Sequence, residues 1–160
     1  MLATGGVAFL LAIAAASRAE GPELAEGLWS VHTVTIENPG NKKKEASFSM
    51  CRDHAYDRSV QAMSKAIKGC TISETFQAGK YSTETSCRNG STVIVSKGVT
   101  TFQGATSTHS ESHVSYAPAM SGISESMTIM DQKYVGSCPA DMQPGDRTMP
   151  DGSVFHLRKQ

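Results

Sequence analysis

Two cysteines lie at equal distances on either side of a turn signal in the stretch GCTISETFQAGKYSTETSC, which spans residues 69–87. The flanking Thr, Ile, Phe and Tyr residues are typical of strands, and Ala78-Gly79 suits a two-residue hairpin turn. The turn fixes a register that pairs Gln77 with Lys80, Phe76 with Tyr81, Ile72 with Thr85 and Cys70 with Cys87. This stretch therefore predicts a β-hairpin with the two cysteines at its base.

One face of this hairpin carries the cysteines and the apolar side chains, and the other face is wholly polar, as in a half-buried hairpin. If Gln77 and Lys80 form a hydrogen-bonded pair, Cys70 and Cys87 form a non-hydrogen-bonded pair. The Cα atoms of such a pair are about 4.5 Å apart, which lies at the lower edge of the usual disulfide range. We therefore predict a disulfide between Cys70 and Cys87.

The first residues, MLATGGVAFLLAIAAASRAEG, are typical of an export signal. The apolar run from Val7 to Ala16 is shorter than the roughly 20 residues that span a bilayer, and Ser17 and Ala19 suit cleavage after Ala19. We expect residues 1–19 to be a signal peptide. No Lys or Arg precedes the run, so a retained membrane anchor is the alternative. No cysteine lies near the cleavage site, which argues against a lipoprotein.

Cleavage leaves residues 20–160, a usual size for one domain without a membrane span. Of fifteen basic residues only Arg18 is lost, so fourteen remain against fifteen acidic residues and the net charge is −1. Nucleic-acid-binding domains usually carry a basic surplus, so we expect no nucleic-acid partner. The one basic cluster, 42–44, is expected to be a solvated strand that resists aggregation.

All four cysteines lie after the expected cleavage site, and an even number in an exported chain favours disulfides. No C-x-x-C pair is present, which argues against a zinc ribbon or a thioredoxin-type site. With Cys70 paired to Cys87, elimination leaves Cys51 to pair with Cys138. The other two connectivities remain open, and peptide mapping that joins Cys51 to Cys70 would exclude our assignment.

A second hairpin is predicted for GLWSVHTVTIENPGNKKKEASFSMC, residues 27–51, with its turn at 38–41. Pro followed by Gly suits the central positions of a type II turn. The resulting register places Trp29 opposite Met50, Val31 opposite Phe48 and Thr33 opposite Ala46. The single tryptophan therefore lies on an apolar face, and we expect it to be a core residue.

Residues 53–69 predict the one helix of the chain. Asp53 is a suitable N-cap, Gly69 a suitable C′ residue, and two lysines lie near the predicted C-terminus. Apolar side chains recur at helical spacing and form one stripe, which consists of Tyr56, Val60, Met63 and Ile67. We expect this helix to lie on a face of the sheet.

Short strand-like runs separated by turn signals continue to Cys138, but their pattern does not fix their register. The tail 139–160 is rich in Pro, Gly and Asp, and the turn signal at 150–152 predicts a small terminal hairpin. The predicted fold is mostly β: a single antiparallel curved sheet or partly closed barrel of about seven to nine strands, with one helix inserted after the second strand. The core of this domain is expected at residues 26–138.

Copper is a candidate ligand that the residue types suggest. His109 and His113 share one face of a predicted strand, and Met127 and Met130 are soft ligands. Along a strand the two histidines are about 13 Å apart, and the two methionines fall on opposite faces. We therefore prefer solvated histidines and core methionines, assign no metal ligand, and keep copper binding as the alternative function.

No catalytic or nucleotide-binding motif is present: G-x-S-x-G, the P-loop, G-x-G-x-x-G and H-E-x-x-H are all missing from the sequence. We therefore assign no catalytic residue and no cofactor, and expect the protein not to be an enzyme. The preferred function is a binding or interaction domain, whose partner is a small apolar ligand or another envelope protein. The oligomeric state is left open.

The order of motifs resembles a bacterial exported family, domain of unknown function 3617. Its members begin with Gly-x-Trp, here Gly27-Leu28-Trp29, and carry a cysteine on each side of a helix, here Cys51 and Cys70. Cys87 on the next strand and a closing Gly-x-Cys, here residues 136–138, complete the pattern. The resemblance implies a periplasmic or secreted protein of a Gram-negative bacterium. It implies no activity, because the family has no established one.

Overall fold

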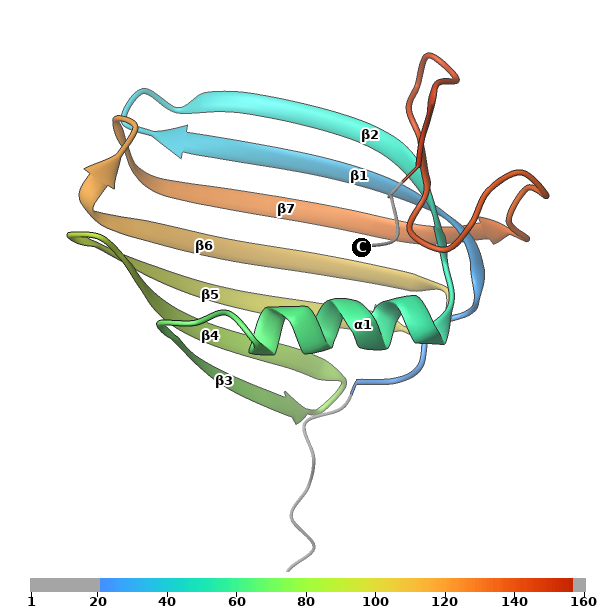
Figure 1. Cartoon of the computed structure of the whole chain (residues 1–160), viewed down its shortest axis with the longest axis horizontal. Coiled ribbons are helices and arrows are strands. Elements are labelled where there is room, and N and C mark those ends of the chain that lie inside the picture. Colours follow the sequence, from blue (N-terminus) through green and yellow to red (C-terminus); the bar gives the residue numbers. More distant parts are fainter. Residues whose placement is uncertain (1–20, 157–160) are drawn as a thin grey trace, which may run out of the picture.

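One antiparallel sheet of nine strands runs through the described part of the chain, residues 21–156, in the computed structural model (Figure 1). The elements are β1 (Gly27–Asn38), β2 (Lys42–Arg52), α1 (His54–Lys65), β3 (Cys70–Gln77), β4 (Lys80–Asn89), β5 (Thr92–Gln103), β6 (Ser107–Met120), β7 (Ile123–Gly136), β8 (Arg147–Thr148) and β9 (Val154–Phe155). Their order in the sheet is β3-β4-β5-β6-β7-β1-β2-β8-β9. The predicted mostly β fold, with one helix after the second strand, is confirmed. The expected signal peptide lies outside the described residues.

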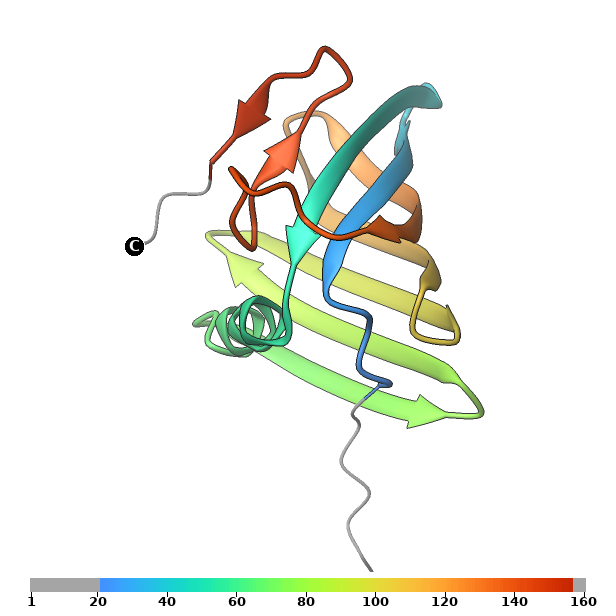
Figure 2. The same ribbon diagram turned by 90° about the vertical axis from the view of Figure 1, so that its right-hand side faces the viewer.

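The sheet curls strongly about α1 without closing into a barrel (Figure 2). We call the face toward α1 the concave face and the opposite one the convex face. Side chains alternate between the faces along each strand, so Trp29, Thr100 and Gln132 belong to the concave face and His32 and His109 to the convex one. The short β8–β9 hairpin continues the curl beyond β2.

The β3–β4 hairpin has the register that its turn predicts, from Gln77 opposite Lys80 to Cys70 opposite Cys87. Ala78 and Gly79 both have positive φ, 51° and 75°, as a two-residue hairpin turn that follows the strand twist requires. A disulfide joins Cys70 to Cys87, whose Cα atoms are 4.1 Å apart.

The β1–β2 hairpin also has its predicted register, with Trp29 opposite Met50, Val31 opposite Phe48 and Thr33 opposite Ala46. Trp29 is fully buried, as expected of a core tryptophan. Its indole Nε1 donates a hydrogen bond to the Ala25 carbonyl at 2.8 Å, which satisfies the one polar group of the ring.

The segment after β7 covers the end of β2. A disulfide joins Cys51 to Cys138, with Cα atoms 5.6 Å apart. The Cys51 N–H donates to the Asp146 carbonyl at 3.0 Å, and the Gly145 N–H donates to the Cys51 carbonyl at 2.8 Å. These contacts bury Cys51 completely. The predicted turn at 150–152 is present and leads into β9.

Gly27, the first residue of the Gly-x-Trp motif, is fixed by a close approach of two backbones. Its φ of 140° disfavours other residues. A Cβ at this position would overlap the Gly136 carbonyl oxygen and lie 2.8 Å from a ring carbon of Tyr134. The motif at the start of β1 and the motif at the end of β7 are therefore two sides of one contact.

Helix α1 begins as predicted, since the Asp53 carboxylate accepts a hydrogen bond from the Tyr56 N–H at 2.6 Å. The predicted end at Gly69 is wrong. The helix ends at Lys65, and the N–H of Ala66 donates to the carbonyls of both Ala62 and Met63. Gly69 instead serves the turn into β3 with a φ of 79°, and its carbonyl accepts from the Arg88 N–H.

Candidate functional site

The concave face is only partly filled. Among the described residues the buried apolar side chains are Trp29 and Val31 on the concave face of β1, Cys51 on the convex face of β2, and Met142 in the segment after β7. The middle of the face is rich in small hydroxyl side chains, which form rows across the sheet such as Thr100–Ser110 and Thr35–Thr128. Small side chains on a curved sheet leave space between the sheet and whatever covers it.

Helix α1 covers this face with its polar side. His54, Asp57, Arg58 and Gln61 recur at helical spacing and point into the space above the sheet. Near the helix C-terminus, Lys65 Nζ lies 2.9 Å from a carboxylate oxygen of Glu74 on β3. The helix therefore lies over the sheet as predicted, but through polar contacts.

The apolar stripe of α1 is not packed against the sheet. Val60 is 41% exposed and Met63 is 63% exposed, and no residue of the helix is buried. At 100° per residue the stripe lies on the opposite side of the helix from the cavity-lining residues. Only its first member is anchored, where the Tyr56 hydroxyl lies 3.9 Å from the Met50 sulfur. The stripe is thus an exposed apolar surface on the side of the helix that faces away from the cavity.

A cavity of about 350 Å³ lies between α1, the concave face and the segment that precedes β1. This size is within the range of about 300–1,000 Å³ that is typical of small-molecule sites. The cavity is lined by Gly21, Pro22, Glu23, Leu24, Arg52, His54, Asp57, Arg58, Gln61, Tyr81, Thr100, Phe102, Thr108, Ser110 and Gln132. Both polar and apolar groups therefore face the same space.

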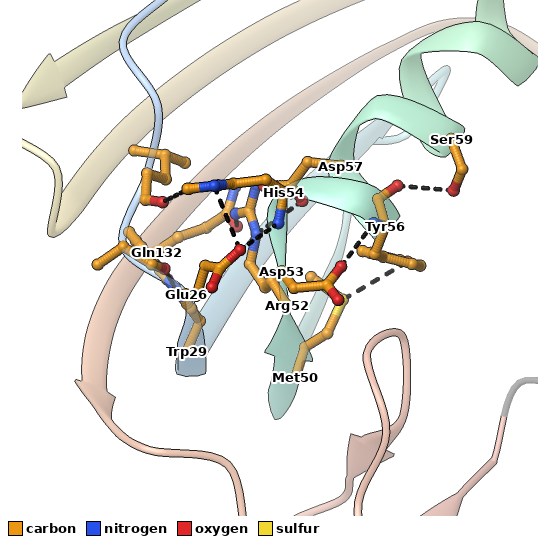
Figure 3. Close-up of polar contacts among 12 residues, drawn as sticks. Glu26, Trp29, Met50, Arg52, Asp53, His54, Tyr56, Asp57, Ser59 and Gln132 are labelled. Atoms are coloured by element: carbon orange, nitrogen blue, oxygen red, sulfur yellow. Dashed lines mark hydrogen bonds and ion pairs between the residues drawn. The ribbon is translucent and has the colours of Figure 1, made fainter.

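Arg52 joins the helix to the sheet at one end of the cavity (Figure 3). Its Nε and Nη2 lie 3.1 Å and 3.0 Å from Asp57 Oδ1, and its Nη1 donates to Gln132 Oε1 at 3.0 Å. The guanidinium also lies over the Trp29 ring, 5.1 Å from its centroid. These contacts hold the first turn of α1 against β1 and β7.

His54 joins the same turn to the segment before β1. Its backbone N–H donates to Glu26 Oε1 at 3.0 Å, and its Nδ1 lies 3.2 Å from the same oxygen. Its Nε2 lies 2.9 Å from the Leu24 carbonyl oxygen. The N-terminal half of the helix is therefore fixed by hydrogen bonds on two sides, although it buries no apolar side chain.

Two lining residues differ from the rest in how their polar atoms are satisfied. Burial raises the pKa of Tyr81, and the hydrogen bond and negative charge of Glu74 raise it further, so the phenol stays protonated. Thr108 is 3% exposed, and its Oγ1 has no hydrogen-bond partner. The neighbouring hydroxyls of Thr100 and Ser110 satisfy each other at 2.9 Å. Thr108 is therefore the one lining hydroxyl that is both buried and unpaired in residues 21–156.

The candidate copper ligands lie on the convex face or apart from each other. His109 lies 2.6 Å from Asp131 and 3.2 Å from Glu111, while His113 lies 3.8 Å from Glu125. Met127 is opposite His113, and Met130 is on the concave face. No group of three or more His, Cys, Asp or Glu side chains suited to a metal ion occurs within the described part of the chain.

Sequence reasoning did not single out the residues that line the cavity. Arg52 and Gln132 are 80 residues apart in the chain, and the unsettled register of the later strands concealed their contact. A signal was present in the helix, where the polar residues at 54, 57, 58 and 61 share one face opposite the apolar stripe. Within residues 21–156 no helix is long and apolar enough to cross a bilayer.

Comparison with known protein families gives one match. The model of the family described as protein of unknown function (DUF3617) matches residues 24–138. This range includes Gly27, the helix, the cavity-lining residues of the sheet and all four cysteines. A search among curated proteins finds no match to the chain.

Proposed function

The chain belongs to the DUF3617 family, proteins of unknown function, and from its geometry we propose that it is a non-catalytic binding protein for a small amphiphilic molecule. The ligand has an apolar chain and a polar end. The apolar chain lies along the exposed stripe of α1, and the polar end enters the cavity beneath the helix.

The exposed stripe of α1 carries this proposal. A helix that covers a sheet normally turns its apolar stripe toward the sheet, whereas Val60 and Met63 are left exposed here. The polar side of the same helix encloses the cavity of about 350 Å³. The stripe and the cavity lie on opposite sides of the helix, so the ligand must be long enough to pass around a helix about 10–12 Å in diameter and must have both an apolar and a polar part.

We further propose that the protein acts in the periplasm or is secreted. The two disulfides favour an oxidising compartment, and residues 1–19 have the composition of a signal peptide. An exported protein of a Gram-negative bacterium meets lipids and their breakdown products, which are amphiphiles of the proposed class.

Two double variants, each of which replaces one valine and one methionine by serine, test where the apolar chain of the ligand binds. Val60→Ser with Met63→Ser removes the stripe, while Val99→Ser with Met127→Ser removes a valine and a methionine that are 42% and 40% exposed on the convex face. Binding of dodecanol is measured by isothermal titration calorimetry. We expect the helix pair to weaken it by about tenfold or more, because each buried methylene contributes about 0.8 kcal/mol, and the control pair to leave it unchanged.

Native mass spectrometry of oxidised protein from a bacterial periplasm gives an independent result. A retained mass of lipid size is the expected outcome. Equal losses for the two variant pairs would place the apolar chain elsewhere. If the wild-type protein neither binds dodecanol nor retains a passenger, the small-molecule proposal is wrong, and an envelope protein that crosslinks to the stripe becomes the better explanation.

A further inference from the structure

Among the described residues, the cavity beneath α1 has one buried polar group that the protein itself leaves unsatisfied. The Thr108 hydroxyl is buried without a partner, and leaving such a group unpaired is energetically unfavourable. Buried polar atoms in native proteins are nearly always hydrogen-bonded. Thr108 lines the cavity with its hydroxyl covered, and rotation about its Cα–Cβ bond would turn that hydroxyl toward a ligand atom in the cavity.

The two arginines that line the cavity differ in whether they form an ion pair. Arg52 is neutralised by Asp57, whereas Arg58 forms no ion pair or side-chain hydrogen bond with another described residue. Arg58 lies one turn from His54 on the cavity side of the helix, next to the amide of Gln61. A guanidinium has five N–H donors and suits the two oxygens of a carboxylate.

One acidic residue opposes an anion in this cavity. Glu23 lies in the segment before β1, lines the cavity and also forms no ion pair among residues 21–156. Its side chain is not within 4.0 Å of Arg58, so it does not neutralise the guanidinium directly. Glu23 therefore weakens anion binding without abolishing it, and its removal provides a test of the charge of the ligand.

We infer that the cavity binds the head group of the amphiphile and that this head group is a carboxylate, held by the Arg58 guanidinium and by a hydrogen bond from the buried Thr108 hydroxyl. This inference rests on the proposed function and specifies its ligand class as fatty-acid-like anions. The apolar chain then leaves the cavity and passes around the helix to Val60 and Met63, which lie on its other side.

Three probes with the same chain and different head groups test the inference: dodecanoate, dodecanol and dodecylammonium, each below its critical micelle concentration. Calorimetric titration of the oxidised wild-type protein should give the tightest binding for dodecanoate. Arg58→Gln should weaken dodecanoate by at least about tenfold, because a hydrogen bond to a charged group contributes about 1.5–3 kcal/mol, and should leave dodecanol unchanged. Arg88→Gln, an exposed arginine on β4 away from the cavity, is the control.

Two further variants separate ligand binding from folding. Glu23→Gln should strengthen dodecanoate binding, because it removes a like charge, and should not change dodecanol binding. Thr108→Val should weaken dodecanoate binding while the free protein becomes no less stable in urea, since the hydroxyl that it removes has no partner in the protein. A loss of stability in Thr108→Val would assign a structural role to that hydroxyl and contradict its role in binding.

The remaining outcomes are distinct. Equal affinities for the acid and the alcohol would overturn the head-group inference and leave the proposed function intact. Tightest binding of dodecylammonium, lost in Glu23→Gln, would identify a cation site and also overturn it. If none of the three probes binds the wild-type protein, the proposed function fails together with the inference.

Discussion

The two ends of the sheet are stabilised in different ways. The packed half, which we define as β1 and β2 with the segment 137–148, contains the fully buried side chains of Trp29, Val31 and Cys51. The open half consists of β3, β4 and β5, and none of the residues that the structure describes in these strands is buried. Each half has one disulfide: Cys51–Cys138 ties a strand to the distant tail segment, and Cys70–Cys87 ties two adjacent strands.

This difference indicates a division of roles. The packed half is the rigid side of the cavity, because its side chains are buried and Arg52 holds it against the first turn of α1. The open half depends on its strand ladder and its hairpin disulfide, and its concave side chains line the cavity instead of a core. Local stability in proteins varies in this way, and binding surfaces come from the less stable end of the range.

The largest difference in stability between the two halves is expected when one aromatic side chain in each half is replaced by alanine. Trp29→Ala should lower the free energy of unfolding by about 3–5 kcal/mol, the usual cost of removing a buried aromatic side chain. Phe76→Ala removes an aromatic of the open half that is 36% exposed and makes a T-shaped contact with Phe102, so it should cost about 1–2 kcal/mol. Urea unfolding of the oxidised proteins measures both. Equal losses would show that the open half has a core of its own.

The second-largest difference is expected between the losses of unfolding free energy that follow removal of each disulfide. Replacing Cys51 and Cys138 by alanine opens a link across 87 residues, while replacing Cys70 and Cys87 opens one across 17. Each link contributes about 2–4 kcal/mol, and in the chain-entropy model the longer one contributes about 1.4 kcal/mol more. Urea unfolding of the two double variants measures this difference. A greater loss in the hairpin variant would show that the open half depends more on its disulfide than the packed half does.

Non-reducing peptide mapping of the wild-type protein is the control for this comparison. It should recover peptides that join Cys51 to Cys138 and Cys70 to Cys87. Recovery of either of the other two connectivities would invalidate the assignment of one disulfide to each half of the sheet.

The two hairpin registers were predictable because turn and pattern agree. The turn at Ala78-Gly79 fixes which residues oppose each other, and the wholly polar outer face of β3–β4 excludes a one-residue shift. The later strands lack this agreement. Val99 and Met127, for example, are apolar yet exposed on the convex face, so alternation alone could not identify the inward side of β5 or β7.

The stripe of α1 shows a second limit of sequence reasoning. Periodicity identified Tyr56, Val60 and Met63 as one face, but it does not reveal whether a partner surface exists. The sheet beneath the helix presents hydroxyls such as Thr100 and Ser110, which favour the polar side of the helix. The cavity was not predictable for a related reason, since most of its sheet residues come from β5 to β7, whose register the pattern left open.

The smallest effect is expected at the seam between the halves, where β6 pairs with β7. Hydrogen bonds that the His109 ring donates to Asp131 and Glu111, together with the charges of these carboxylates, raise the pKa of His109. A raised folded-state pKa means that the protonated imidazole stabilises the fold. This contribution is complete below the unfolded pKa of about 6.5 and is lost as the pH rises through the folded-state value. His109→Gln should therefore flatten the stability curve above about pH 6.5.

The expected amplitude is within the range of about 0.2–1 kcal/mol for exposed ion pairs, and solvent screening places it toward the lower limit. Urea titrations from pH 5 to pH 9 at low and high salt measure it, because the effect should decrease with ionic strength. The control is His113→Gln on the same strand, where the nearest carboxylate is 3.8 Å away. If His109→Gln keeps the wild-type slope, the Asp131–His109 contact does not stabilise the seam.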